Sequence, residues 1–419
     1  MPTDEIIELD VDAMVHGGKV MGRHAGRPVF VTYAVPGERV RARITEAKRN
    51  FAQAEMVEVL KPSPDRVTPR CPHYGTGHCG GCQLQHMSYA AQLRYKRDVV
   101  LDQLTRIGKV RNVESLVRET IASPEPWGYR TRADFHRAPD GGLGFVSTEP
   151  PRVEPVETCH ILAPAAMALL DELDLDDETI TEVRVQVDSA GQGMFVISTS
   201  DDLAPELAVD VPVSINLLLS DNEPVNLIGA SHALYDVRGR RFRATAGSFF
   251  QVNLPQAGTL VDLVLEWANP TADDAVLDLY AGVGLFTAFL AERAALVTAI
   301  ESYPPAVTDA DENLAEFDNV DLFEGGVGPV LEGLLDEEAG PYAAAVVDPP
   351  RAGLDVDVLD ALGAFAPPTL VYVSCDPATL ARDVQRLGER HGYRLLAVQP
   401  VDMFPQTYHI ECVAQLVRT

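Results

Sequence analysis

The chain has 419 residues, of which 46% are hydrophobic and 23% charged, and this composition predicts a soluble globular protein of two or three domains. Its net charge of −28 argues at first against a nucleic-acid partner. The acidic N-terminus lacks the basic and apolar regions of a secretory signal, and no apolar run approaches the length of a membrane span. We therefore expect a cytoplasmic protein with no membrane partner.

The charge is distributed unevenly along the chain. Residues 1–140 contain 21 Lys and Arg against 17 Asp and Glu, whereas residues 141–419 contain 13 against 45. A polyanion such as RNA can therefore bind the N-terminal third despite the acidic total. Composition alone favours an RNA-binding N-terminal third no more than an acidic protein whose N-terminal third happens to have an ordinary charge balance.

Residues 1–60 show the pattern of a small β-barrel, because short β segments alternate with turns rich in Gly and Pro. Arg39, Arg41 and Arg43 alternate along one of these strands and so share a face, which indicates either an RNA-binding surface or a merely solvated one. The stretch resembles a TRAM domain, an RNA-binding module with an OB-like barrel. The matching residues are His16-Gly17-Gly18, Phe30-Val31 and Pro36-Gly37-Glu38.

Four cysteines follow the barrel, three of them close together and one distant. Cys71, Cys79 and Cys82 have a C-x7-C-x2-C spacing, and Cys159 lies much further along the chain. Four thiolates can bind one zinc ion or a [4Fe–4S] cluster, and the spacing leaves both open. Six cysteines in so long a chain do not form the pattern of a secreted disulfide scaffold. The nearby histidines are alternative ligands, although we expect them to be bystanders or to support the ligands; they are His73, His78 and His86.

The middle of the chain indicates a mixed α+β domain. Residues 88–108 form an amphipathic helical pattern, and residues 126–147 are typical of a hairpin. From about residue 160 to 240, apolar strand patterns alternate with short acidic loops. We expect a domain at residues 61–240 that holds the cysteine site.

Strands and helices alternate after residue 241, as in a parallel α/β sheet. Residues 275–291 predict a strand, a Gly-rich turn and a helix, and Glu301 ends the next strand, 23 residues beyond Asp278. An acidic residue at this distance suits a nucleoside cofactor, because it can bind the ribose hydroxyls. The alternative is a Gly-rich turn that serves only packing.

Four polar residues occupy the carboxyl ends of strands in this region: Asp278, Glu301, Asp348 and Cys375. In an open parallel sheet these ends line one crevice, where ligands bind. Cys375 also precedes a helix with Asp376 as its predicted N-cap, so we expect the helix terminus to stabilise its thiolate. A buried structural cysteine is the alternative.

Glu411 lies in a final predicted strand. A glutamate on an exposed strand face is the ordinary interpretation, but its apolar neighbours indicate a buried carboxylate with a raised pKa.

These motifs together resemble the 5-methyluridine RNA methyltransferase family, of the TrmA/RumA type, over essentially the whole chain. The resemblance implies an N-terminal TRAM barrel at residues 1–60, a central domain at 61–240 and a Rossmann-like class I methyltransferase domain at 241–419. The motifs that carry it are CGGCQLQHMSY, SFFQVN, DLYAGVGLF, DPPRAG, VSCDPATLARD and DMFPQTYHIECVAQL.

The resemblance also implies roles for single residues. Cys375 is the expected nucleophile and Glu411 the expected base. The residues implied to line the pocket for S-adenosylmethionine and the target uridine are Gln251, Tyr280, Glu301 and Asp348. The residues implied to hold a [4Fe–4S] cluster, with zinc as the alternative, are Cys71, Cys79, Cys82 and Cys159.

Two positions depart from the family pattern. The gap between Cys71 and Cys79 is longer than in better-known members, and Leu285 replaces an Asn that touches the cofactor in several of them. We expect a monomeric RNA-modifying enzyme, with 23S rRNA favoured over tRNA as its substrate. The alternatives are a non-catalytic RNA-binding or chaperone protein and an amino-group RNA methyltransferase.

Overall fold

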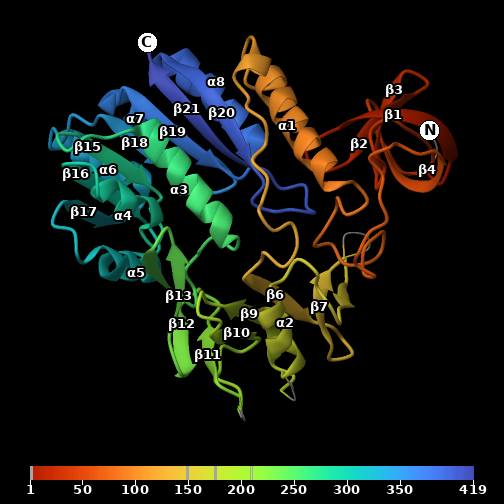
Figure 1. Cartoon of the computed structure of the whole chain (residues 1–419), viewed down its shortest axis with the longest axis horizontal. Coiled ribbons are helices and arrows are strands. Elements are labelled where there is room, and N and C mark those ends of the chain that lie inside the picture. The colour runs from red at the N-terminus through yellow and green to blue at the C-terminus, as the bar shows by residue number, and fades with distance from the viewer. Residues whose placement is uncertain (1–2, 148–150, 174–176, 208, 210) are drawn as a thin grey trace.

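The computed structural model describes residues 3–147, 151–173, 177–207, 209 and 211–419. In this part of the chain the strands form a closed barrel, two seven-stranded sheets and a two-stranded ribbon (Figure 1). None of the helices described is long and apolar enough to cross a membrane.

The N-terminal strands close into a five-stranded barrel in the order β1–β2–β3–β5–β4, as predicted. Along β1 and β4, alternate side chains are buried, because successive residues of a strand point to opposite sides. The strands are β1 (Ile6–Met14), β2 (Val20–His24), β3 (Arg27–Thr32), β4 (Glu38–Ala47) and β5 (Ala52–Lys61).

The arginine face of β4 is balanced by acidic neighbours. β1 pairs antiparallel with β4, which places Glu8 opposite Arg41 and Asp10 opposite Arg39. Arg39 contacts Asp10 at 3.2 Å, and Arg41 contacts Glu8 at 3.0 Å and Glu58 of β5 at 2.5 Å. The shared face was predicted correctly, but its charge is largely neutralised, which favours a solvated surface over an open RNA-binding one.

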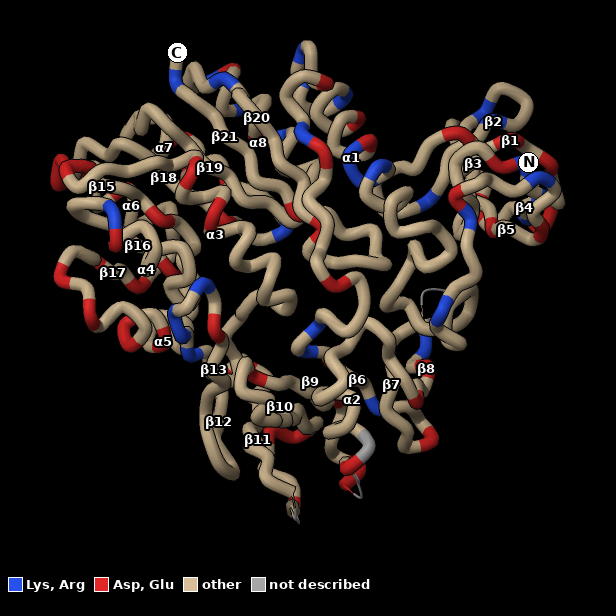
Figure 2. The backbone as a smooth tube through the Cα atoms, in the orientation of Figure 1, with Lys and Arg blue, Asp and Glu red and all other residues tan. Residues whose placement is uncertain are grey.

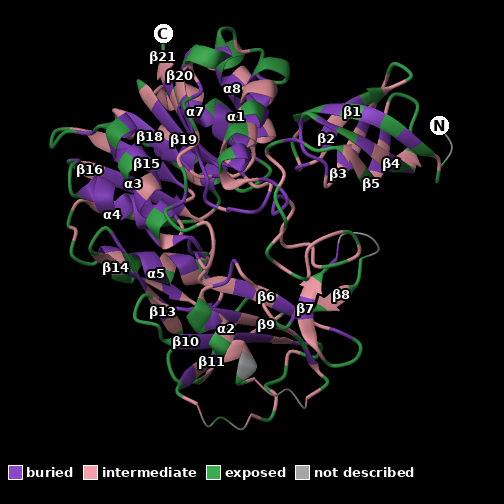
Figure 3. Ribbon diagram, turned by 45° about the vertical axis from the view of Figure 1, so that its right-hand side comes forward, coloured by how far each residue is buried: buried purple, intermediate pink, exposed green. Residues whose placement is uncertain are grey.

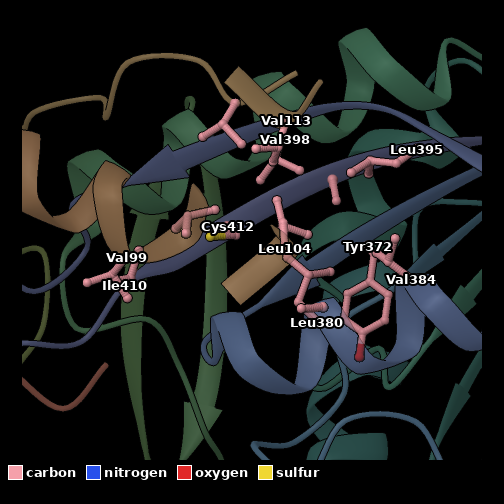
Figure 4. Packing of buried hydrophobic residues seen from close by; sticks show 14 of the residues in the cluster. Val99, Leu104, Val113, Tyr372, Leu380, Val384, Leu395, Val398, Ile410 and Cys412 are labelled. Atoms are coloured by element: carbon pink, nitrogen blue, oxygen red, sulfur yellow. The ribbon is translucent and has the colours of Figure 1, made fainter. Parts of the chain in front are cut away.

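Helix α1 (Tyr89–Arg106) connects the barrel to the C-terminal sheet. Ser88 caps its N-terminus by accepting the backbone N–H of Ala91. Figure 4 shows Val99 and Leu104 of this helix packed among residues of the last strands and of α8 (Pro377–His391). One buried hydrophobic cluster therefore runs from the barrel interior through α1 into the C-terminal sheet.

The central sheet has the order β12–β11–β10–β9–β6–β7–β8 and is mostly antiparallel, with β10 and β11 parallel. The predicted hairpin at 126–147 forms β6 and β7, and α2 (Pro164–Asp171) packs against β9 and β10. The strands are β6 (Arg132–Arg137), β7 (Leu143–Val146), β8 (Val153–Pro155), β9 (Ile180–Val187), β10 (Gly193–Thr199), β11 (Val213–Leu218) and β12 (Pro224–Ile228). The 3₁₀ turn η1 (Val113–Ser115) precedes this sheet in the chain.

The C-terminal sheet has the order β17–β16–β15–β18–β19–β21–β20. Its first five strands are parallel, whereas β21 runs antiparallel between β19 and β20. The strands are β15 (Ala275–Leu279), β16 (Leu296–Glu301), β17 (Val320–Glu324), β18 (Ala344–Val347), β19 (Thr369–Ser374), β20 (Tyr393–Val401) and β21 (Glu411–Arg418).

Helices cover both faces of this sheet, as the predicted doubly wound Rossmann-like fold requires. Two separate hydrophobic clusters lie on its two faces, and Figure 3 shows the buried residues running through the strands between them. One face carries α3 (Leu254–Ala268), α4 (Leu285–Ala291) and α5 (Pro304–Leu314). The other carries α6 (Val327–Asp336), α7 (Val356–Phe365) and α8, with α1 beside α8.

We propose that the three sheets mark the predicted domains at 1–60, 61–240 and 241–419. β5 ends at Lys61, and the ribbon of β13 (His232–Val237) and β14 (Arg240–Thr245) lies across the second boundary. Figure 2 shows acidic residues gathered around α5, α6 and β17 on the outer side of the last domain.

The segment between β20 and β21 is held in place by buried polar contacts to α1. The ammonium group of Lys96 contacts Asp402 Oδ1 at 2.6 Å and the carbonyl of Phe404 at 3.0 Å, and the side chains of Lys96 and Asp402 are fully buried. The side chains of Gln92 and Gln406 are hydrogen-bonded at 2.9 Å, and Gln92 also accepts the backbone N–H of Gln406. This segment leads directly into β21.

Candidate active site

A cavity of about 580 Å³ lies at the carboxyl ends of the parallel strands. Its walls come from the turn after β15, the ends of β16, β18 and β19, the start of β21, and the residues before α3. All six residues predicted for the reaction line it: Gln251, Tyr280, Glu301, Asp348, Cys375 and Glu411. The strand order thus brings together residues that are up to 160 positions apart in the chain.

The Gly-rich turn and Glu301 form one wall. Gly282 and Gly284 have φ values of 57° and 85°, which glycine adopts without steric cost, so the chain can turn sharply between β15 and α4. The carboxylate of Glu301 accepts the backbone N–H of Gly282 at 2.9 Å and that of Tyr303 at 2.8 Å. These bonds fix Glu301 at the end of β16. Leu285, the first residue of α4, gives the same wall an apolar side chain.

Asp278 does not line the cavity, in contrast to the other predicted strand-end residues. It is fully buried and accepts a hydrogen bond of 2.6 Å from the Thr287 hydroxyl on α4, so it supports the turn from behind. Burial raises the pKa of Asp278 to about 6, and burial together with Asp278 raises the pKa of Asp348 to about 7.

Cys375 lies between β19 and α8, as predicted, but the expected stabilisation of its thiolate is wrong. Burial, followed by the nearby carboxyl of Glu411, raises the pKa of the Cys375 thiol to about 11. The helix terminus does not offset this effect, because the Asp376 carboxylate already accepts the N–H groups of Ala378 at 2.8 Å and Thr379 at 3.0 Å. The positive end of α8 is therefore already neutralised by its own cap.

Asp376 is also engaged with the barrel. Its carboxylate lies 3.4 Å from Nε2 of His16, on the turn between β1 and β2. Although burial raises the pKa of Asp376, the hydrogen bonds from His16 and Thr379 outweigh it and hold the pKa at about 2. An acid this strong is a poor proton acceptor, so Asp376 is unsuited to act as a general base.

Glu411 lies beside Cys375 because of the sheet register. β21 pairs antiparallel with β19, with Cys412 opposite Ser374, so the next pair along the two chains is Glu411 and Cys375. Glu411 is 3% exposed, which confirms the predicted burial. Burial and then Asp348 raise the pKa of Glu411 well above its usual value. Burial and the neighbouring carboxyl of Asp348 thus favour the protonated form of Glu411.

Sequence reasoning missed several residues that line the cavity. Arg351 lowers the pKa of both Cys375 and Glu411 by its charge, and it lies 3.2 Å from Nδ1 of His409. Burial and then Arg351 lower the pKa of His409 to about 4, so this ring is neutral and can accept the Arg351 hydrogen bond. The sequence did offer a signal for them, because the motif DPPRAG contains Arg351 and the motif TYHIEC contains His409.

Aromatic residues form the rest of the cavity. Phe249 is 59% exposed, and the guanidinium of Arg132 on β6 lies 5.6 Å from its ring centre. An exposed aromatic ring beside a cation is a good surface for stacking a planar, anionic ligand such as a nucleotide. The other aromatic residues of the wall are Phe250, Tyr280, Phe286 and Phe404.

The four predicted cysteine ligands surround a second cavity, of about 130 Å³, between the central sheet and the loop that joins β5 to α1. They are Cys71, Cys79, Cys82 and Cys159, and all four are free thiols. Burial raises the pKa of each of them, and at Cys79 and Cys82 the neighbouring cysteines raise it further, to about 11 and about 12. Among the described residues, no group of three or more His, Cys, Asp or Glu has the geometry to hold a metal ion.

The three histidines near this cavity have different surroundings. His73 lines it, whereas His78 lies 3.3 Å from Glu154 and His86 is buried against the carbonyl of Ala34. Only His73 is therefore placed as a neighbour of the cysteines. A further histidine of the wall, His160, follows Cys159 directly.

Comparisons with known proteins show what the chain is similar to. A model described as TRAM domain matches residues 5–57, and one described as tRNA (Uracil-5-)-methyltransferase matches residues 335–419. The chain is 36% identical to an uncharacterized RNA methyltransferase of Halalkalibacterium halodurans, over 99% of the chain and 97% of that protein. It is 34% identical to another from Streptomyces avermitilis, over 98% of each.

A solved structure is also similar over its whole length. The Pyrococcus abyssi tRNA (uracil-54, C5)-methyltransferase, in complex with S-adenosyl-L-homocysteine, is 25% identical with a TM-score of 0.74. The match covers 98% of this chain and 100% of that one. The similarity therefore includes the barrel, the central sheet and the C-terminal sheet.

The raised pKa of Cys375 predicts slow alkylation at neutral pH. The rate at which iodoacetamide modifies the Cys375 peptide, followed by mass spectrometry, should rise about tenfold per pH unit up to about pH 11, because the thiolate is the reacting form. Arg351→Met should slow the reaction at pH 8, because it removes the charge that lowers this pKa. Arg394→Met, on the exposed edge of β20, should not. A plateau reached below pH 8 would contradict the raised pKa.

Proposed function

Because the chain belongs to the RNA (uracil-5-)-methyltransferase family, we propose that it methylates C5 of a uridine in RNA through a covalent adduct with Cys375. The observation that carries this proposal is the placement of Cys375, directly after β19, beside Glu411, at the start of the adjacent strand β21, in one cavity with Glu301 and Asp348. S-adenosylmethionine supplies the methyl group as a sulfonium. An exposed ring, Phe249, and a cation, Arg132, stand at the side from which a nucleotide can enter.

The reaction explains why a thiol and a base are needed together. C5 of uracil is too weak a nucleophile to accept a methyl group directly. The sulfur of Cys375 forms a bond to C6, and the electron pair of the C5–C6 double bond moves to C5 and O4. C5 would then take the methyl group of S-adenosylmethionine, and the bond from the sulfonium sulfur to that methyl group would break and leave S-adenosyl-L-homocysteine. Glu411 removes the remaining C5 proton, the double bond forms again, and the bond from C6 to sulfur breaks, which restores the thiolate of Cys375.

The pKa of Cys375 and that of Glu411 are both raised in the ligand-free protein, so the ionised forms that react have to be favoured by a nearby charge. Arg351 is the cation placed to do this, since its charge lowers the pKa of Cys375 and Glu411 alike. The raised pKa of Glu411 makes its carboxylate a strong proton acceptor once it is ionised. Arg351 also connects this pair to His409 on the segment before β21.

The remaining predicted residues would bind the cofactor and the target base. Glu301, at the end of β16, is placed to accept the ribose hydroxyls of S-adenosylmethionine. Gln251, Tyr280 and Asp348 line the rest of the pocket. Where several relatives use an Asn, Leu285 offers only apolar contact, so Glu301 and the backbone of the Gly-rich turn carry more of the binding.

We propose ribosomal RNA as the first substrate to test and tRNA as the second. The cysteine site and the barrel favour the ribosomal branch by resemblance, whereas the similar Pyrococcus abyssi enzyme acts on tRNA. The target uridine is expected in an unpaired loop, because a stacked and paired base is costly to extrude into a pocket. Mapping 5-methyluridine in both RNAs from a deletion strain separates the two.

We further propose that Cys71, Cys79, Cys82 and Cys159 bind a [4Fe–4S] cluster. Four thiols around one cavity are the donor set that such a cluster uses, and about 130 Å³ leaves room for a group larger than a single ion. Bound iron would favour the thiolate forms that burial now disfavours. The cluster would fix the loop between the barrel and α1, because the methyl transfer above requires no electron transfer.

Cys375→Ala should abolish methyl transfer and the covalent adduct. RNA with 5-fluorouridine at the target should trap the wild-type enzyme, because fluorine cannot leave as a proton does. The adduct should be visible on a denaturing gel and disappear in Cys375→Ala. Cys412→Ala is the matched control, since Cys412 is fully buried, and it should keep the adduct. An adduct that depends on Cys412 would exclude Cys375 as the nucleophile.

Glu411→Gln should stop the reaction after methyl transfer. The variant can still add Cys375 to uracil, but the C5 proton stays, so enzyme covalently bound to methylated RNA should accumulate. Normal turnover of Glu411→Gln would rule out its role as the base. Asp376→Asn is the control, and accumulation of the adduct in that variant would exchange the two roles.

Protein purified without oxygen should be brown and contain about four iron atoms per chain, with broad absorbance near 400 nm typical of thiolate-bound iron. Cys82→Ser should lose the colour and iron while Cys375→Ala keeps both. A colourless protein with one zinc per chain would instead establish the zinc alternative.

A further inference from the structure

A third cavity, of about 230 Å³, lies where the barrel meets the rest of the chain. Three separate parts of the chain form its walls, and no residue lines both this cavity and the methyl-transfer cavity. The barrel contributes the turn between β1 and β2 and parts of β3, β4 and β5. The loop between β5 and α1, which carries Cys71, Cys79 and Cys82 and is called the cysteine loop below, contributes Thr76, Gly80 and Gln83. The segment before β21 contributes Tyr408.

The walls are held together by close contacts, so the cavity is largely preformed. Gly18 has a φ of 79°, and a Cβ atom at this position would approach Cβ of Tyr408 to 2.9 Å. The backbone N–H groups of Gln83 and Leu84 donate to the carbonyl of Gln406 at 3.1 and 2.9 Å. The barrel turn and the cysteine loop are thus packed directly on the segment that leads to Glu411.

This cavity and the methyl-transfer cavity share one wall. Tyr408 lines the first and His409 the second, and the centres of the two rings are 4.4 Å apart. Two consecutive residues therefore face two neighbouring cavities. A polymeric ligand that places one of its monomers in the methyl-transfer cavity can therefore place a nearby monomer in this third cavity.

The polar groups of the cavity suit an unpaired nucleobase. Among the residues that the structure describes, neither the carboxylate of Glu55 nor the hydroxyl of Tyr408 has a hydrogen-bond or ion-pair partner. A carboxylate accepts hydrogen bonds from the amino groups of bases, as at N4 of cytosine. The Tyr408 ring offers a face for stacking, and the volume suits one base rather than a helix.

Two cationic side chains, those of Lys19 and Arg43, lie at or near this cavity. Lys19 lines the cavity, where its ammonium group donates to the Gln53 side chain, and Arg43 lies opposite Glu55 in the register of β4 and β5. No acidic partner of Arg43 is found within the described part of the chain. In contrast to Arg39 and Arg41, Arg43 is therefore available to a phosphate.

We propose that this cavity binds one unpaired base of the substrate RNA that carries an exocyclic amino group and lies close to the target uridine. The proposal rests on the proposed function for the identity of the ligand as RNA. It assigns the barrel a recognition role at its junction with the active-site segment, rather than on the neutralised arginine face of β4.

The test uses the full-length protein and unmethylated total RNA from a deletion strain. Glu55→Gln replaces two acceptor oxygens by one, so the KM for RNA should rise roughly tenfold, while kcat stays within about twofold. Tyr408→Phe should raise KM in the same way. Glu58→Gln is the matched control, because Glu58 is on the same strand but pairs with Arg41 on the outer surface, and its KM should not change.

Ultraviolet cross-linking of the bound RNA, read by mass spectrometry, provides a second measurement. A peptide cross-linked at Tyr408 should carry adenosine, cytidine or guanosine monophosphate. An unchanged KM in Glu55→Gln, or a Tyr408 peptide that carries only uridine monophosphate or no nucleotide, would overturn the proposed base site. Absence of methyl transfer by the wild type would overturn the proposed function instead, and the cross-link would then still decide whether an RNA base occupies this cavity.

Discussion

A fully buried ion pair, Lys96 with Asp402, fixes the segment on which both cavities depend. Removing one partner of such a pair typically costs about 3–5 kcal/mol, because it leaves the other charge buried without compensation. The segment that the pair holds presents Tyr408 to the barrel and His409 to the reaction cavity, and it ends where Glu411 begins β21. Helix α1 thereby fixes the position of Tyr408 relative to His409 and Glu411, and so the position of one cavity relative to the other.

Acidic and basic residues are found in different parts of the molecule. Acidic residues gather around the outer helices of the last domain (Figure 2). In contrast, Lys19 lines the barrel cavity, Arg43 lies opposite Glu55 of that cavity, and Arg132 lies beside the exposed ring of Phe249 in the reaction cavity. RNA is therefore repelled by most of the surface of that domain and attracted where its bases can enter. A net charge of −28 is thus compatible with an RNA substrate, since local charges determine where the chain binds.

The sequence predicted the strand ends of the active site because a parallel sheet brings them to one edge whatever its detailed order. It could not predict what depends on register and burial. The alternation of Arg39 and Arg41 was visible, but their pairing with Asp10 and Glu8 exists only because β1 lies beside β4. The turn before α8 was visible too, yet the pKa of Cys375 follows from how deeply that turn is buried. Residues such as His409 lie in irregular backbone, where no periodicity marks them.

The position of β21 has a consequence for synthesis on the ribosome. This strand lies inside the sheet, between β19 and β20, although it is translated after both. Until it emerges, β19 and β20 have no hydrogen bonds to each other, and their apolar faces have no partner on that side. Because domains tend to fold as they are synthesised, the growing chain would expose an unpaired, aggregation-prone sheet edge until β21 emerges. Closure of that edge and placement of Glu411 in the reaction cavity are then one event.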